Sequence, residues 1–132
     1  MGRLGWLLVM MLTAGVTIAS CGGVQERYAL KDRPFATKSQ PTLDQITQAI
    51  LQSGPPHLWK LKVVRPGLIE GRRDWGNGRH GIVVDVVYDT KQYRIDLKST
   101  KNLNQSGNTV HRAYNRETIR LYDEIYRQTS KL

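Results

Sequence analysis

The chain has 132 residues, a single cysteine, and 20 Lys and Arg against 11 Asp and Glu, which gives it a formal net charge of +9. This length suits one domain and is too short for two good cores, and a single thiol excludes an intrachain disulfide. The fold must therefore depend on its hydrophobic core. The basic balance indicates either a polyanionic partner or a surface that is simply basic.

The first twenty residues have the three parts of an export signal. Arg3 gives a basic start, an apolar run extends from Leu4 to Val16, and the small residues Ala19 and Ser20 follow. A membrane-spanning helix needs about 20 consecutive apolar residues, and this run is shorter. We therefore expect residues 1–20 to be a signal peptide.

The end of this segment, Ile18-Ala19-Ser20-Cys21, resembles the box at which bacterial lipoproteins are lipidated and cleaved. The resemblance implies a thioether-linked diacylglycerol on Cys21, cleavage before it, and an acyl chain on the new amino terminus. Two or more acyl chains hold a protein durably at a membrane, because each buried CH₂ contributes about 0.8 kcal/mol. A plain secreted or membrane-spanning protein is the alternative.

Gly22 follows the cysteine, at the place where an aspartate retains lipoproteins at the inner membrane in enterobacteria-like systems. The resemblance therefore implies the outer membrane, on its periplasmic side. Nucleic acid is not an expected partner in that compartment. Anionic lipid headgroups, lipopolysaccharide and acidic wall polymers are the polyanions that remain.

Residues 21–40 have no regular apolar period and combine two glycines with scattered charges and Pro34. We expect lipidated Cys21 to be followed by a flexible tether, which over about 20 residues has a span of roughly 25 Å. A single α+β domain is then expected to occupy residues 41–132.

A first helix is predicted to begin after Pro41, because Thr42 and Gln45 have the spacing of a capping box. The segment Ser53-Gly54-Pro55-Pro56 is typical of a helix end. One apolar stripe runs along this helix and consists of Leu43, Ile46, Ile50 and Leu51.

Four strand-like segments follow, at residues 58–64, 68–75, 82–89 and 93–98, each with alternating apolar and polar residues. The second has an uncertain phase, because turning its apolar residues to the core also turns Arg73 there. A bulge near Gly71 would resolve this conflict. The short connections predict an antiparallel meander.

A last helix is predicted from a cap at Asn108 or Thr109 to about Gln128. The apolar stripe on this helix is broad, as expected for a helix that lies across a sheet. The main apolar stripe consists of Val110, Tyr114, Thr118, Leu121 and Ile125.

Three arginines recur at every fourth position of this helix, on a face away from the apolar stripe. We call Arg112, Arg116 and Arg120 the arginine ridge. The ridge is either a solvated helix face or a surface that docks an anionic lipid or an acidic partner. Like charges at this spacing cost a few tenths of a kcal/mol each. The pairs Arg120 with Glu124 and Arg127 with Asp123 are expected to offset part of that cost.

Several short motifs occur in the order seen in a family of small proteobacterial lipoproteins that has no assigned activity. The chain resembles that family over roughly residues 42–125, and it departs at Glu117, where such proteins often carry Trp. The resemblance implies fold and location and transfers no catalytic residue. The matching motifs are Tyr88-Asp89, Tyr93-Arg94-Ile95, Ser99, Asn102-Leu103 and His111-Arg112-Ala113-Tyr114-Asn115-Arg116.

The candidates for catalysis and metal binding are few. The histidines His57, His80 and His111 are isolated from one another and from carboxylates at helical spacing, so no metal site is predicted. His111 is expected to fix the loop at residues 102–108. Because no nucleophile motif and no phosphate-cradling loop is present, no catalytic residue and no cofactor are expected.

The sequence therefore predicts an α+β fold of order α-β-β-β-β-α, a four-stranded antiparallel meander with two helices packed on one face. The expected function is that of a non-catalytic bacterial envelope lipoprotein. It would be a binding or assembly accessory, anchored through lipid on Cys21, with an anionic lipid or an envelope protein as partner. The alternative is a small-ligand or lipid carrier with a pocket between sheet and helices. Strand addition at the first strand of the meander is discouraged by Lys60 and Lys62.

Overall fold

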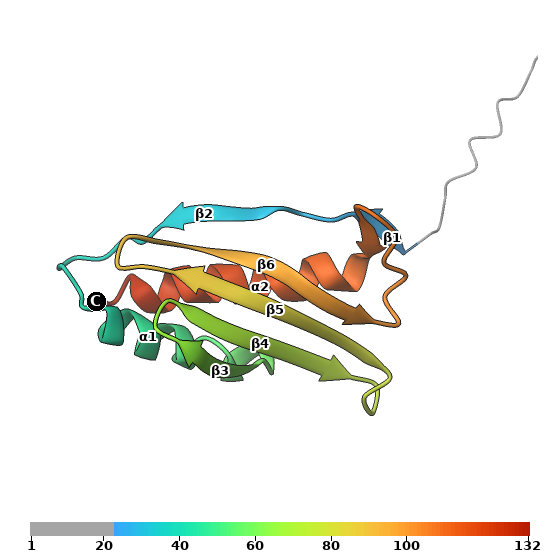
Figure 1. The fold of residues 1–132 in the computed structure, drawn as a ribbon, viewed down its shortest axis with the longest axis horizontal. Coiled ribbons are helices and arrows are strands. Elements are labelled where there is room, and N and C mark those ends of the chain that lie inside the picture. Colours follow the sequence, from blue (N-terminus) through green and yellow to red (C-terminus); the bar gives the residue numbers. More distant parts are fainter. Residues whose placement is uncertain (1–22) are drawn as a thin grey trace, which may run out of the picture.

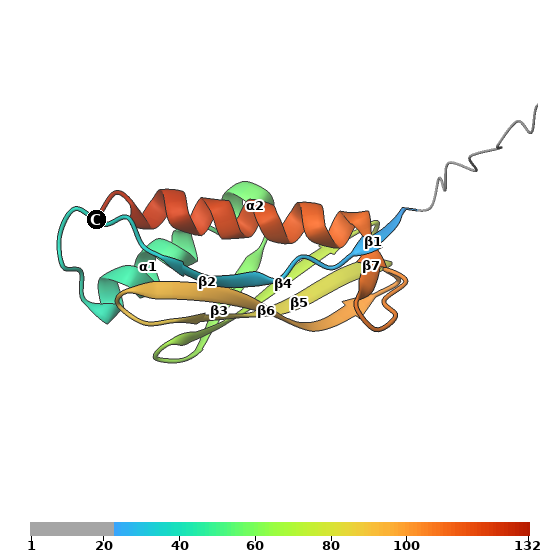
Figure 2. The same ribbon diagram turned by 90° about the horizontal axis from the view of Figure 1, so that it is seen from above.

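Two helices cover one face of a five-stranded antiparallel sheet (Figures 1 and 2). The computed structural model describes residues 23–132, so the predicted signal peptide and Cys21 lie outside the described residues. The elements are, in chain order, β1 (Val24–Glu26), β2 (Leu30–Pro34), α1 (Leu43–Gln52), the 3₁₀ helix η1 (Pro55–His57), β3 (Lys60–Arg65), β4 (Leu68–Trp75), β5 (His80–Tyr88), β6 (Gln92–Lys101), β7 (Thr109–His111) and α2 (Arg112–Thr129). The large sheet has the order β2-β6-β5-β4-β3, and β1 pairs antiparallel with β7 in a separate small sheet.

The predicted meander is present, but the sheet contains one strand more than predicted. Strands β3, β4, β5 and β6 are neighbours in chain order, as their short connections indicated. The additional strand, β2, pairs antiparallel with the other edge of β6. The α+β class is therefore confirmed, whereas the predicted count of four strands is wrong.

The described part of the predicted flexible tether is folded onto the domain. The guanidinium of Arg33 in β2 lies 3.8 Å from the centre of the Tyr126 ring. Phe35 stacks on Tyr93, with their ring centres 5.2 Å apart. The tether prediction is wrong for β1 and β2. No apolar period marks β2, because this edge strand partly buries only Leu30 and Arg33, on the two sides of a register shift.

Strand β4 pairs with β5 in unbroken register over its whole length, so the predicted bulge near Gly71 is wrong. Arg73 keeps the core-facing phase of the strand, and its Nε lies 3.6 Å from Oε2 of Glu117 in α2. A register shift lies instead between β5 and β6, at Val83 and Val84. An acidic partner on the helix, rather than a bulge, resolves the conflict in this strand.

Helix α1 begins and ends as predicted. The backbone N–H of Gln45 donates to Oγ1 of Thr42 at 3.2 Å, and the N–H of Thr42 donates to Oε1 of Gln45 at 2.9 Å. This reciprocal pair is the predicted capping box. At the other end, Ser53 caps the helix, and its hydroxyl donates to the carbonyl of Ala49.

Helix α2 begins later than predicted. Nδ1 of His111 accepts a hydrogen bond from the N–H of Ala113 at 3.2 Å, so His111 is the cap rather than Asn108 or Thr109. The predicted start is wrong because residues 109–111 form β7 and pair with β1. The helix is thereby held between the small sheet at its start and the large sheet along its length.

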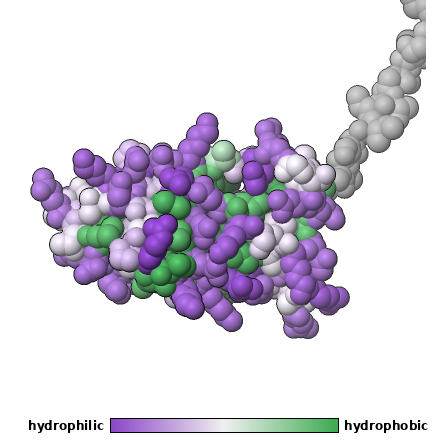
Figure 3. All heavy atoms as spheres, in the orientation of Figure 1, coloured by the Kyte–Doolittle hydropathy of each residue, from purple (hydrophilic) through white to green (hydrophobic). Residues whose placement is uncertain are grey.

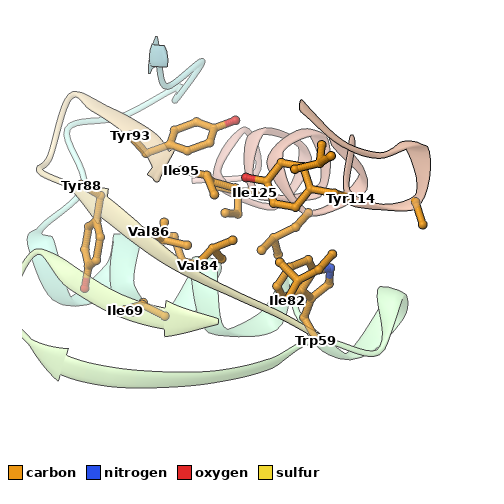
Figure 4. Close-up of a cluster of buried hydrophobic side chains, with 14 of the residues drawn as sticks. Trp59, Ile69, Ile82, Val84, Val86, Tyr88, Tyr93, Ile95, Tyr114 and Ile125 are labelled. Atoms are coloured by element: carbon orange, nitrogen blue, oxygen red, sulfur yellow. The ribbon is translucent and has the colours of Figure 1, made fainter. Parts of the chain in front are cut away.

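A continuous cluster of side chains fills the space between the sheet and the helices (Figure 4). The phenol of Tyr93 donates to the carbonyl of Tyr122 at 2.6 Å, and the indole of Trp59 donates to the carbonyl of Glu117 at 3.3 Å. These bonds satisfy the polar ends of large buried aromatic residues. Both predicted stripes belong to this core, with Leu43, Ile46, Ile50 and Leu51 from α1 and Val110, Tyr114, Thr118, Leu121 and Ile125 from β7 and α2.

The opposite face of the sheet is mainly hydrophilic (Figure 3). Lys98 of β6 reaches across β5 to Glu70 of β4, with Nζ 2.8 Å from Oε2. Val63 and Val64 are large apolar residues that stay exposed near the end of the edge strand β3. In the described part of the chain, neither helix combines the length and the apolar character needed to cross a bilayer.

Candidate functional site

The described chain starts against the first turn of α2. The carbonyl of Gly23 accepts a hydrogen bond from the backbone N–H of Arg112, and Val24 pairs with His111 in the β1–β7 ladder. A Cβ atom on residue 23 would lie 2.6 Å from Nε2 of His111, so a side chain there would force the imidazole to move. Glycine therefore permits the close approach that holds this end of the chain at the start of α2, where Figure 1 shows β1.

Each of the three histidines contacts a neighbouring group of the folded chain. His111 does bond the loop at residues 102–108, as predicted, but through its backbone N–H, which donates to the carbonyl of Leu103 at 2.7 Å. Its ring instead caps α2. Nε2 of His57 lies 3.6 Å from Oε2 of Glu124, and His80 stacks on Trp75 with ring centres 5.6 Å apart. Among the residues from 23 onwards, no three His, Cys, Asp or Glu side chains gather where they could hold a metal ion.

The arginine ridge is exposed on α2, but its three members differ in their partners. Nε of Arg116 lies 3.0 Å from Oε1 of Glu117, and a guanidinium nitrogen of Arg120 lies 3.6 Å from the same oxygen. Within the described chain, Arg112 has no carboxylate within 4.0 Å. The uncompensated charge of the ridge is therefore concentrated at its amino-terminal end.

The ion pairs predicted to offset the ridge are replaced by others. Glu124 pairs with Arg127 rather than with Arg120, and Nε of Arg127 donates to Oε2 of Glu124 at 3.0 Å. The hydrogen bonds from Arg127 are the largest cause that lowers the pKa of Glu124 to about 2. Asp123 pairs with Arg33 of β2 at 2.9 Å. The prediction for Asp123 was wrong because β2, assigned to a tether, supplies a cation to this face of the helix. The prediction for Arg120 was wrong because its guanidinium lies against Glu117 instead.

Glu117 connects the ridge to the sheet. Its side chain is only 5% exposed, and its carboxylate lies against the guanidinium groups of Arg73, Arg116 and Arg120. In the sequence this position was notable only as a departure from the Trp of the resembling family. One buried carboxylate therefore neutralises part of the ridge and part of the core-facing charge of β4.

Asn115 holds the segment between β1 and β2 on α2. Its buried Oδ1 accepts from the N–H of Tyr28 at 2.9 Å, and its Nδ2 donates to the carbonyl of Glu26 at 2.8 Å. Beside these bonds lies a notch of about 270 Å³, whose lining includes Arg112 and Arg116. Two members of the arginine ridge thus share one recess at the start of α2.

A larger opening, the edge cleft, lies where β2 leaves β6. The two strands pair from Pro34 with Gln92 to Leu30 with Ile95, and the chain before Leu30 turns toward α2. The hydrogen bond from the N–H of Tyr28 to α2 holds it there. The edge cleft has a volume of about 530 Å³, and its lining includes Arg27, Leu30, Lys31, Ile95, Leu97 and Tyr114.

The predicted ridge residues come together on one exposed helix face, and Cys21 lies outside the described residues. Sequence reasoning missed the edge cleft, because Arg27 was assigned to a tether and Tyr114 to the core stripe. Its two walls are far apart in the sequence, and no local signal marks them. Neither protein-family models nor curated protein sequences match this chain.

Proposed function

We propose that this chain is a non-catalytic bacterial envelope lipoprotein, a binding or assembly accessory held at the periplasmic face of the outer membrane by lipid on Cys21. The basic start, the apolar run and Ile18-Ala19-Ser20-Cys21 support this, together with Gly22 after the cysteine. The resemblance of residues 42–125 to small proteobacterial lipoproteins points to the same location. Lipid on the cysteine and on the new amino terminus would give a durable anchor.

The observation that carries the proposal is the hydrogen bond between the carbonyl of Gly23 and the N–H of Arg112. Cys21 precedes Gly23 by two residues, and a chain extends at most about 3.6 Å per residue, so a lipidated Cys21 could have its Cα atom no farther than about 7 Å from that of Gly23. An anchor at this place would hold the β1–β7 end of the domain against the headgroups. The domain would then stand on the membrane surface rather than at the end of a tether.

The charges at this end suit an anionic surface. Arg112 bonds to Gly23 through its backbone, Arg116 follows one turn later on α2, and Arg27 comes four residues after Gly23, next to Glu26. Each Lys or Arg near an anionic membrane surface contributes about 1 kcal/mol, and the attraction decays over about 10 Å at 0.1 M salt. Arg120 lies about 12 Å beyond Arg112 along the helix axis, so it contributes less to membrane binding.

The centre of the core is filled, which supports a surface-binding accessory over a carrier that encloses its ligand. A small-ligand or lipid carrier needs a cavity between sheet and helices, as many ligand sites are enclosed in this way. In the described chain, Ile46, Val84 and Ile125 from the two layers are fully buried in one packed cluster (Figure 4). The surfaces around the start of α2 are therefore the places where a partner is expected.

Metabolic labelling with an alkyne fatty acid, in a bacterium that expresses the chain, tests the anchor. We expect the labelled protein in the outer-membrane fraction of a density gradient. The Cys21→Ser variant is expected to be unlabelled and to accumulate as the longer precursor. Ser20→Ala is the matched control, because it keeps a small residue before the cysteine and should retain the label. An unlabelled wild-type chain would contradict the proposal.

A further inference from the structure

The edge cleft is lined by an almost buried tyrosine whose hydroxyl forms no hydrogen bond within the described residues. Tyr114 is 2% exposed, and its phenol oxygen bonds to no residue of the described chain. In Figure 4 its hydroxyl end points toward Ile95 of β6, and both residues line the cleft. Among the described residues this oxygen is not one of the fully buried side-chain atoms without a partner, so it is open to the cleft, and a molecule bound there can accept its hydrogen bond.

One turn of α2 both opens the edge cleft and supplies this donor. Asn115 draws the backbone of Tyr28 onto the helix at 2.9 Å, which keeps the chain before Leu30 away from β6. The neighbouring residue, Tyr114, lines the cleft that results. The position of the hydroxyl is therefore fixed by the packed core and not by a mobile side chain.

Two cations line the same cleft without an acidic partner. In the part of the chain that the structure describes, Arg27 and Lys31 have no carboxylate within 4.0 Å. The acids of the lining are already engaged, because Asp96 lies 3.0 Å and Asp32 lies 3.8 Å from nitrogens of Arg94. The lining thus has three cations, Arg27, Lys31 and Arg94, against the two carboxylates, which leaves a small net positive charge beside the hydroxyl.

The phenol keeps its proton at neutral pH and so remains a donor. Burial raises the pKa of Tyr114 to about 12, the positive charge of Arg27 opposes this rise, and the negative charge of Asp96 adds to it. Arg27 and Tyr114 line the same cleft, so both groups can act on one ligand bound there. A protonated phenol and a guanidinium can both donate to one oxyanion, and the guanidinium adds a positive charge.

We propose that the edge cleft binds an oxyanion, the phosphate group of a small ester or of a lipid headgroup, between the Tyr114 hydroxyl and the Arg27 guanidinium. The guanidinium fork matches the spacing of phosphate oxygens, and donors to a charged acceptor form the stronger hydrogen bonds. Leu30, Ile95 and Leu97 offer apolar surface to the carbon part of the ligand. The site goes beyond the arginine ridge and does not require the proposed lipid anchor.

Titration calorimetry with glycerol 3-phosphate tests the site in the full chain carrying Cys21→Ser, dissolved in a neutral detergent at constant ionic strength. We expect Tyr114→Phe to weaken binding about tenfold, because it removes one hydrogen bond to a charged group. Arg27→Gln should weaken it similarly. Arg65→Gln is the matched control, since this exposed arginine at the end of β3 lies at the other end of the domain (Figure 1).

Vesicles distinguish the two sources of phosphate. Binding of glycerol 3-phosphate that depends on Tyr114 assigns the cleft to a small phosphate ester. Binding that depends on Tyr114 only with vesicles containing phosphatidylglycerol, against phosphatidylcholine alone, assigns it to a headgroup. Equal affinities of wild type, Tyr114→Phe and Arg27→Gln for both probes would overturn the proposal. The melting temperature of each variant is measured without ligand, and if Tyr114→Phe unfolds, Arg27→Gln decides the outcome.

Discussion

Nε of Arg73 in β4 lies 3.6 Å from Oε2 of Glu117 in α2, and the two side chains are 14% and 5% exposed. Among the described residues, this Nε has no hydrogen-bond partner, so the carboxylate is what compensates its charge. The pair joins the helix to the sheet away from the apolar stripe. It also allows a strand with an arginine in its core-facing phase to lie under a helix.

Removing the carboxylate is expected to destabilise the fold strongly. Glu117→Ala should lower the free energy of unfolding by about 3–5 kcal/mol, because it leaves a buried guanidinium without its counter-charge. Urea unfolding followed by circular dichroism measures the change. Arg120→Ala is the control, and it should lose less than about 1 kcal/mol, since its pair is exposed on one side. A double change of Arg73 and Glu117 to Leu should recover most of the loss, and equal losses in the single and double variants would contradict this account.

The stability of the domain is expected to fall in acid partly through Glu124. Its pKa is lowered from the ordinary 4.5 to about 2, mainly by hydrogen bonds from Arg127, so folding favours its ionised form. The stabilisation is therefore complete above about pH 4.5 and is lost as the pH falls toward about 2. Urea unfolding of wild type and Glu124→Gln across this range measures it. The gap between the two proteins should shrink as the pH falls, and a constant gap would contradict the prediction.

The elements that could be predicted are those whose signals are local. Thr42 and Gln45 mark the start of α1 within four residues. The alternation in β5 and the apolar stripe of α2 each repeat along a single segment of the chain. Strand β2 could not be found in this way. It lies at an edge, and its inward residues are three apart around a register shift. Its sequence therefore shows neither the two-residue period of a strand nor the 3.6-residue period of a helix.

The site was harder to predict because it depends on pairs that are distant in the sequence. The phase of β4 could not be settled from the strand alone, since the partner of Arg73 is on the last helix. Tyr114 was correctly assigned to the core, but its free hydroxyl depends on Asn115 drawing Tyr28 away from β6. Such contacts follow from the assembled fold and have no signature within either segment.

The contact between Gly23 and His111 is expected to set the position of β1. Gly23→Ala would place a Cβ atom 2.6 Å from Nε2 of the imidazole, which must then leave its capping position. We expect a loss of about 1 kcal/mol, the usual worth of such a cap, and faster hydrogen exchange in β1 and β7.

A double-mutant cycle isolates that contact. In the background His111→Ala the clash is absent, so Gly23→Ala should there cost much less than in the wild type. Urea unfolding of the four proteins measures the coupling. Additive losses would mean that the two residues act independently, and the close approach would then have no part in holding β1.

The arginine ridge is expected to bind membranes unevenly along its length. For residues 22–132, replacing Arg112 with Gln should weaken co-sedimentation with phosphatidylglycerol vesicles about fivefold, since one cation near an anionic surface contributes about 1 kcal/mol. Arg120→Gln should have a smaller effect, because this residue shares Glu117 and lies farther along the helix from Gly23. Raising the salt concentration should reduce wild-type binding more than that of the variant with all three arginines changed to Gln. Arg65→Gln serves as the charge-matched control at the far end of the domain. Unchanged co-sedimentation of the triple variant would show that the ridge is only a solvated helix face.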